Sequence, residues 1–150
     1  MTSPDLPQST PRIYLIALHV DRLLLSVYMM SLTALRLVAC VHAVAICLQP
    51  VLAGAYLNGA GPALRMHEPI GLSLAGLGLL QLLIATIWWR SGGRLLAPAA
   101  TLLITLGEGF EVAMGYTRQL AIHIPLGIAL VGGAVAFAVW TTRQRVAVPA

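Results

Sequence analysis

The stretch HEPIGLSLAGLGLLQLLIATIWW, residues 67–89, carries one charged side chain, that of Glu68, and is otherwise built largely from aliphatic, small and aromatic residues. A helix of this length crosses a hydrocarbon core of about 30 Å. Trp88 and Trp89 close the run, as aromatic residues do where a membrane meets water. The stretch therefore predicts a transmembrane helix.

Three further apolar runs of similar length occupy residues 32–57, 95–116 and 121–140, and short joins separate the four runs. Only 9% of the residues are charged, whereas about 25% is usual for a soluble domain. Short joins make consecutive helices antiparallel neighbours. We therefore expect an all-α, integral membrane, up-down four-helix bundle over residues 31–142, with a short tail at 143–150.

Arginine placement predicts the orientation of the bundle. Two arginines, Arg65 and Arg118, lie on one predicted side of the membrane. The other side collects the remaining seven: Arg12, Arg22, Arg36, Arg90, Arg94, Arg143 and Arg145. The positive-inside rule places both termini in the cytoplasm of a multi-pass protein of the cytoplasmic (inner) membrane. The bilayer is the expected partner, and the sequence has no basic stripe for nucleic acid.

The first thirty residues, 1–30, form an N-terminal extension with two parts. Residues 1–11 are polar and proline-rich, which predicts disorder. Residues 13–30 are apolar but interrupted by His19, Asp21 and Arg22. Two interpretations stay open: an extra interfacial helix, or a true start at Met29 or Met30 with the upstream part not made.

A five-residue pattern occurs twice, as HEPIG from His67 and as HIPLG from His123. Each copy opens an apolar run, the second and the fourth, and these helices lie diagonally across an up-down bundle. Proline two positions after each histidine suits the first turn of a helix. Gly71 and Gly127 follow one turn deeper on the same face, where they leave room for a ligand.

Two facing imidazoles above two glycine surfaces are typical of a heme held between helices. We therefore predict heme b between His67 and His123, both as metal ligands, with Gly71 and Gly127 beside it near the outer leaflet. The alternative is that both histidines are interfacial residues at helix starts and both glycines serve helix packing alone.

Other polar residues lie in the outer half of the predicted spans and are assigned to the same cofactor site: Gln49, Glu108 and Glu111. Carboxylates inside a span normally face the core and have a function. The two glutamates are expected to support a ligand histidine, exchange a proton or hold a cation, unless they are protonated and bond to neighbouring helices. His42 is expected to be a hydrogen-bonded core residue, and Cys40 and Cys47 small buried ones.

The stretches LLITLGEGFEVAMG, residues 102–115, and LAIHIPLGIAL, residues 120–130, resemble helices three and four of one half of heme A synthase. The positions of His67 and His123 match that family's ligands, and the chain is similar more loosely to small four-helix b-type cytochromes. The resemblance implies heme binding for electron transfer or heme handling, with a homodimer that restores eight helices. The family's acidic residue before its second-helix histidine has no counterpart near Leu64 and Arg65, so its oxidation of heme is not implied.

Two other functions remain open from the sequence. The first is a small ion-coupled transporter that uses Glu108 and Glu111. The second is a non-catalytic accessory subunit of a larger membrane complex. The sequence contains no nucleotide-binding motif (GxGxxG or P-loop), no GxSxG motif of serine hydrolases and no HExxH motif of metalloproteases. We therefore assign no catalytic residues and do not expect an independent enzyme.

Overall fold

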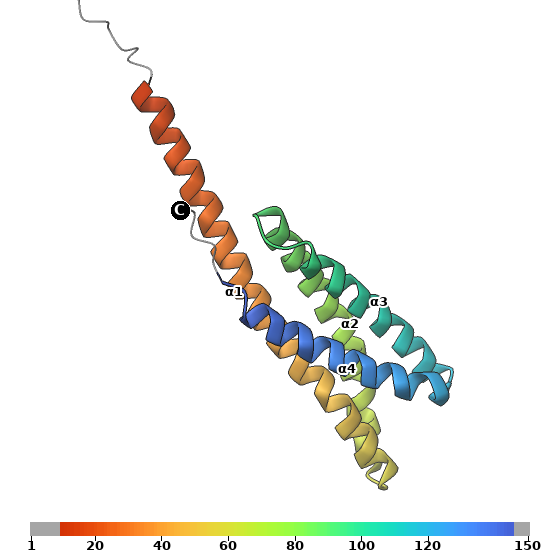
Figure 1. Cartoon of the computed structure of the whole chain (residues 1–150). Helices are drawn as coiled ribbons and strands as arrows, with labels where there is room; N and C mark the ends of the chain where they lie inside the picture. Colours follow the sequence, from red (N-terminus) through yellow and green to blue (C-terminus); the bar gives the residue numbers. More distant parts are fainter. Residues whose placement is uncertain (1–9, 146–150) are drawn as a thin grey trace, which may run out of the picture.

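The computed structural model describes residues 10–145, and over this range every regular element is helical. The helices are α1 (Thr10–Leu57), α2 (Gly61–Arg90), α3 (Leu96–Tyr116) and α4 (Leu120–Thr142). They pack in an up-down arrangement (Figure 1). Each helix is long and apolar enough to cross a membrane. The predicted all-α four-helix membrane architecture is confirmed at this level.

Each helix in the bundle packs against two neighbours. Both α1 and α3 lie between α2 and α4, so that α1 is diagonal to α3 and α2 is diagonal to α4. Small residues at the contacts let the helix backbones approach closely, as is usual in membrane bundles. The buried core consists of aliphatic, small and aromatic side chains, among them Leu35, Ala39, Ile46, Ala85, Ala97, Ile104, Leu130, Ala134 and Phe137.

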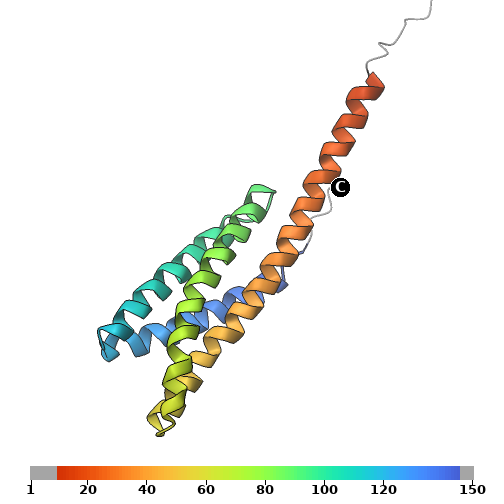
Figure 2. The same cartoon turned by 180° about the vertical axis from the view of Figure 1, so that it is seen from behind.

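The two hairpins, α1 with α2 and α3 with α4, turn at what we call the hairpin end, residues 57–61 and 116–120. Gly59 has a φ of +90° in the first of these turns, a conformation that glycine adopts at little cost. Seen from opposite sides, the tips of the two hairpins diverge from each other (Figures 1 and 2). The bundle is therefore less tightly closed at this end.

The second helix begins at Gly61, not at His67 as its apolar run predicts. Pro62 occupies its first turn, where the missing N–H has no helical partner to lose. Pro69 and Pro125 consequently lie inside α2 and α4. The prediction that these two prolines occupy first turns is wrong, because hydropathy marks where a helix enters lipid rather than where it begins.

The first helix is one continuous element from Thr10 to Leu57. The predicted boundary at residue 30, with a separate interfacial helix before it, is therefore not a break in the structure. Tyr28 lies beside Trp88, with ring centroids 5.9 Å apart, and α2 ends at Arg90. From Thr10 to Tyr28 the helix is about 27 Å long. This part of α1 projects beyond the other helices (Figure 1). The disorder expected for residues 1–9 lies outside the described residues.

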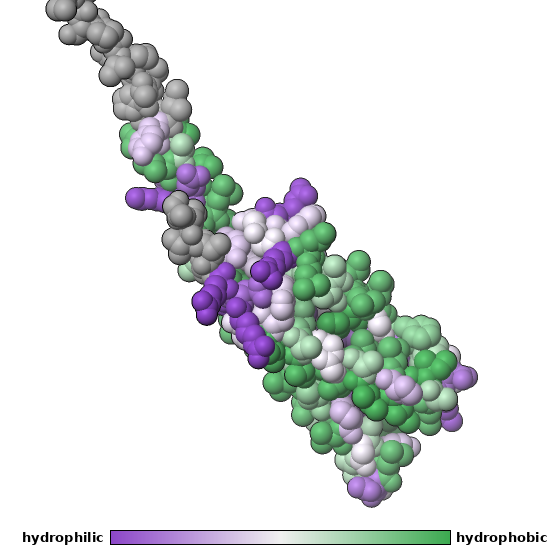
Figure 3. Space-filling view, in the orientation of Figure 1, coloured by the Kyte–Doolittle hydropathy of each residue, from purple (hydrophilic) through white to green (hydrophobic). Residues whose placement is uncertain are grey.

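Aromatic side chains cluster at the end opposite the hairpin turns. Trp88 is buried and contacts Tyr28 and Trp140, with ring centroids 5.9 and 6.1 Å apart. Arg36 donates to the backbone carbonyls of Thr141 and Gln144 at the same end. Hydrophilic surface gathers here and at the hairpin tips, with a mainly hydrophobic zone between them (Figure 3). This distribution is that of a bundle that spans a bilayer.

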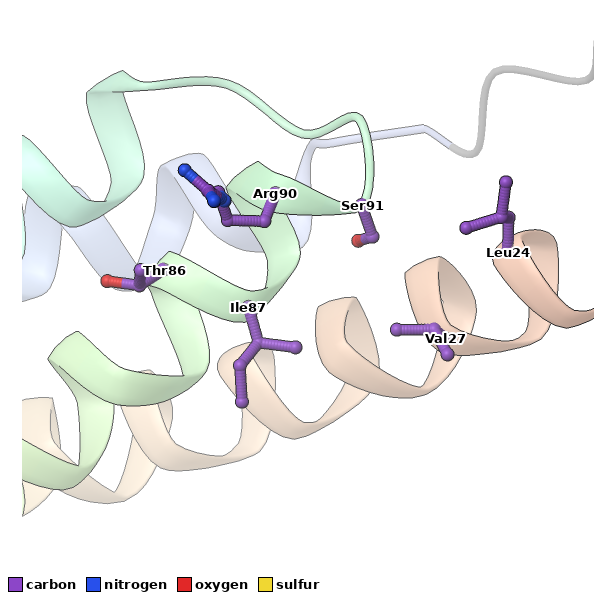
Figure 4. A pocket seen from close by; sticks show the side chains of 6 residues that line it. All are labelled: Leu24, Val27, Thr86, Ile87, Arg90 and Ser91. Carbon is purple, nitrogen blue, oxygen red and sulfur yellow. The ribbon is translucent and has the colours of Figure 1, made fainter.

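A shallow groove of about 290 Å³ separates the projecting part of α1 from the end of α2. Leu24 and Val27 line it from α1, and Thr86, Ile87, Arg90 and Ser91 line it from α2 (Figure 4). Its wall is almost entirely apolar. We therefore assign no polar ligand to it.

Candidate functional site

His67 of α2 and His123 of α4 come together near the hairpin end. Their ring centroids are 6.3 Å apart and their ring planes are inclined at 67°. The helices that carry them are diagonal in the bundle and make no direct contact, so the two imidazoles meet across the bundle. The sequence places both rings at one level, and the structure brings them to one site.

Each imidazole of the pair bonds to a backbone carbonyl on the preceding helix. His67 Nδ1 lies 3.3 Å from the carbonyl oxygen of Gln49, and His123 Nδ1 lies 3.1 Å from that of Glu111. These contacts fix Nδ1 as the donor and leave Nε2 as the nitrogen with a free lone pair. Among the described residues, neither Nε2 has a hydrogen-bond partner. Metal-binding histidines commonly have this arrangement.

The two predicted glycines lie against the same residues that bind the histidines. A Cβ at Gly71 would lie 3.7 Å from Gln49 Oε1, and a Cβ at Gly127 would lie 2.8 Å from Glu111 Oε1. The surfaces that the sequence predicts to be clear for a ligand therefore carry polar side chains from α1 and α3. A planar ligand reaches the Gly127 surface only if the Glu111 side chain turns away.

Glu111 and Gln49 have further polar atoms in this site. Glu111 Oε1 also lies 3.0 Å from His123 Nδ1. Glu111 Oε2 and Gln49 Nε2 are buried and lack a hydrogen-bond partner among the described residues. Four of the predicted site residues, together with their glycines, thus form a repeated unit: one histidine, one polar side chain and one glycine from each hairpin.

Glu108, the remaining predicted site residue, lies elsewhere. Its side chain is buried, and Oε1 is 2.5 Å from His42 Nε2. His42 Nδ1 is 3.1 Å from Gln81 Oε1, and Gln81 Nε2 is 3.5 Å from the hydroxyl oxygen of Thr101. We call these four residues the central cluster. The prediction that His42 is a hydrogen-bonded core residue is confirmed, whereas Glu108 is not part of the histidine pair's site.

At the central cluster α2 and α3 pack closely against each other, with Gly78 at the contact. A Cβ at Gly78 would lie only 2.6 Å from Thr105 Oγ1 and 2.8 Å from Glu108 Oε2. Only glycine therefore lets α3 bring this carboxylate against the α2 backbone. Glu108 Oε2 and Thr105 Oγ1 are buried without a hydrogen-bond partner among the described residues. Gln81 and Gly78 were not singled out from the sequence, although an amide in mid-span is itself an unusual feature.

Glu68 joins the two hairpins at their tips, where Tyr116 donates its hydroxyl proton to Glu68 Oε1 at 2.8 Å. An acidic residue at the start of the apolar run would suit a helix N-terminus, but α2 begins at Gly61 and has no acidic residue in its first turn. Glu68 therefore lies inside the helix.

The donor set of the site limits its chemistry. Over residues 10–145 no group of three or more His, Cys, Asp or Glu side chains could hold a metal ion. A structural zinc site needs four protein ligands. Two imidazoles would be enough for an iron whose other ligands belong to a cofactor.

Comparisons with protein-family models, with curated proteins and with solved structures found no match to this chain. Evidence for its function therefore comes from the geometry of its own residues.

Proposed function

We propose that this integral membrane protein binds heme b, which His67 and His123 would hold as iron ligands. The observation that carries the proposal is the approach of the two imidazoles from diagonal helices, 6.3 Å between ring centroids. Two imidazoles at this separation, each with Nε2 free of a hydrogen-bond partner among the described residues, would be able to hold a heme iron between them.

The contacts behind each ring support the same role. An imidazole that donates from Nδ1 to a carbonyl is held in one tautomer, and its Nε2 becomes a better electron donor. Gln49 and Glu111 each supply such a carbonyl. Bound heme would supply one-electron redox chemistry, and the protein would hold the iron and restrict access of water. We propose electron transfer or heme handling near the outer leaflet as the role of this site.

The test is an absorption spectrum of the protein purified in detergent, recorded oxidised and then after dithionite reduction, with hemin added if the protein is colourless. We expect a Soret band that shifts on reduction. His67→Ala or His123→Ala should remove it. His42→Ala is the matched control and should retain most of it. The absence of a Soret band after hemin addition, or equal retention in all three variants, contradicts heme binding.

A second candidate function, proton- or ion-coupled transport, is favoured by the central cluster. Glu108 is 3% exposed, pairs with His42, and keeps one carboxylate oxygen without a hydrogen-bond partner. A carboxylate and an imidazole in contact within a span can exchange one proton. The transporter predicted from the sequence uses Glu108 together with Glu111, but each of these glutamates has its own histidine.

This second candidate predicts a protein without a chromophore. Glu108→Gln should then abolish substrate-driven proton flux in reconstituted vesicles, and Glu111→Gln should affect it much less. A protein that binds heme and shows no substrate-driven proton flux, with or without either substitution, would exclude transport. An accessory subunit would instead co-purify with larger membrane proteins, and this remains the third prediction.

A further inference from the structure

The projecting part of α1 presents apolar side chains that remain largely exposed, although Leu24 and Val27 at its base also face the end of α2 across the groove of Figure 4. It begins beyond Tyr28, which belongs to the aromatic cluster that marks the edge of the membrane zone. Apolar surface of this extent on one helix is rarely left in water, and an isolated helix of this length is only marginally stable. The exposed large residues are Tyr14, Leu15, Ile16, Leu18, Val20, Leu23, Leu24, Leu25 and Val27.

One stripe of residues continues from this projection to the hairpin end of α1. Its members alternate in spacings of four and three, all are aliphatic or methionine, and all lie outside the buried core. This spacing is that of the d and a positions of a heptad repeat. We call the stripe the seam: Ile16, Val20, Leu23, Val27, Met30, Ala34, Leu37, Val41, Val44, Leu48 and Val51.

We propose that the seam pairs with the seam of a second copy of this chain, so that two α1 helices form a parallel two-stranded coil. The a positions include Val20, Val27 and Val41. The d positions include Leu23 and Leu37. β-branched residues at a with leucine at d favour two parallel strands. In two copies with the same membrane orientation, related by an axis along the membrane normal, α1 helices that meet are parallel.

The residues beside the seam agree with this pairing. Polar side chains of the projection lie off the seam, at Asp21, Arg22 and Ser26 among others. Ser26 and Thr33 flank the seam and donate their hydroxyl protons to the carbonyls of Arg22 and Met29 in their own helix. They therefore leave no unpaired polar group at the contact.

Small residues continue along the same flank into the membrane zone. Cys40 is exposed and Cys47 is half-buried on α1, so the expectation that both are buried is not met within a single chain. Together with Thr33 they form a line of small side chains at seven-residue spacing. Such a line lets two membrane helices approach closely.

The continuity of α1 favours a second copy over the lipid surface as the occupant. An interfacial helix lies in the membrane plane, which requires a sharp bend between the projection and the span. Sharp bends occur at proline, at glycine or at a disrupted turn. From Arg12 to Gln49 the sequence contains neither proline nor glycine, and the helix is unbroken.

Single-cysteine cross-linking in lipid nanodiscs or native membranes tests the proposal, in a background with Cys40→Ser and Cys47→Ser. Val20→Cys, Leu23→Cys and Leu37→Cys place a thiol on the seam. Leu18→Cys and Leu25→Cys are matched controls, since these leucines are also exposed in the projection but lie on the opposite side from the seam. A disulfide requires Cα atoms within about 7 Å, so under mild oxidation we expect about tenfold more dimer from seam positions than from controls.

Two outcomes overturn the pairing. Equal cross-linking at seam and control positions would show random collision. No cross-linking at Val20→Cys and Leu23→Cys, together with protection of Leu18→Cys and Leu25→Cys from a water-soluble maleimide, would show that the projection lies on the lipid surface. The pairing does not depend on heme, because the seam and the histidine pair share no residue.

Discussion

In the central cluster both ring nitrogens of His42 are bonded to side chains, Glu108 on one side and Gln81 on the other. Near the hairpin end, His67 and His123 each use one nitrogen on a backbone carbonyl. His42 is 1% exposed, whereas the two rings of the pair are partly exposed. Histidine therefore has both ring nitrogens bonded in the central cluster, whereas one ring nitrogen of each histidine in the pair is free to bind a ligand.

The difference follows from how tightly the bundle closes at each level. At the central cluster Gly78 lets α2 and α3 meet closely, so side chains from three helices can satisfy one another. At the hairpin end the two hairpins diverge (Figure 2), and each histidine finds its partner within its own hairpin. We infer that the central cluster stabilises and specifies the bundle, and that the histidine pair is where a ligand can bind.

The largest expected effect is loss of stability when the central histidine is removed. His42→Ala leaves a cavity and strips Glu108 and Gln81 of a partner, which should lower the free energy of unfolding by about 3 kcal/mol. His67→Ala, at the more open site, should cost less than about 1 kcal/mol. Reversible unfolding in mixed micelles measures both. Equal losses would contradict the assignment of different roles to the two sites.

The next effect concerns the close contact of α2 with α3. Gly78→Ala places a Cβ 2.6 Å from Thr105 Oγ1, and this overpacking should cost about 2 kcal/mol. Gly76→Ala is the control on the same helix, because a Cβ there meets nothing within 4 Å, and it should be neutral or slightly stabilising. If Gly76→Ala destabilises the protein as much, general helix effects and not this contact explain the loss.

A smaller effect separates the two glycines of the histidine pair. Gly127→Ala meets Glu111 Oε1 at 2.8 Å, whereas Gly71→Ala meets Gln49 Oε1 at an ordinary 3.7 Å. The methyl group at position 127 should therefore crowd Glu111 and also fill the surface that a ligand would use once Glu111 turns away, which should weaken hemin binding about tenfold. Gly71→Ala should change it about twofold or less. A hemin titration followed by absorbance compares them, and the reverse order would show that α2 rather than α4 limits access.

The smallest expected effect is at the hairpin tips. Tyr116→Phe removes the hydrogen bond to Glu68 in an exposed setting, where water replaces the lost partner, and should leave the free energy of unfolding almost unchanged. Hemin affinity should stay unchanged, because neither residue contacts the histidine pair's carbonyls. A marked fall in affinity would instead mean that this bond holds the diverging hairpins at the correct spacing.

Most of the fold was predictable from hydropathy. Four long apolar runs with short joins define four antiparallel spans, because lipid requires every backbone group to be bonded within a helix. Helix starts were less predictable: α2 begins at Gly61 and α1 at Thr10, outside the apolar runs that reveal them. Turn residues and continuous helical propensity set those starts, and hydropathy does not report either.

The candidate site was predictable only in part. The repeated pattern identified His67, His123 and both glycines, because duplication places equivalent residues at equivalent depths. It did not identify which residue faces each glycine. It also assigned Glu108 to the histidine pair, although Glu108 and Glu111 point to different histidines. Residues three apart lie on neighbouring but distinct parts of a helix face, and a small rotation decides which neighbour each one meets.

Local sequence therefore determined which segments are long and apolar enough to cross a membrane, and that there are four of them. Those properties depend on transfer of each segment from water to lipid, which is a sum over nearby residues. Tertiary structure alone decided the partners: His42 with Glu108, each paired imidazole with a carbonyl, and Gly78 with Thr105. Which residues contact each other depends on the rotation and register of helices that are distant in sequence. Only the packing of those helices fixes their rotation and register.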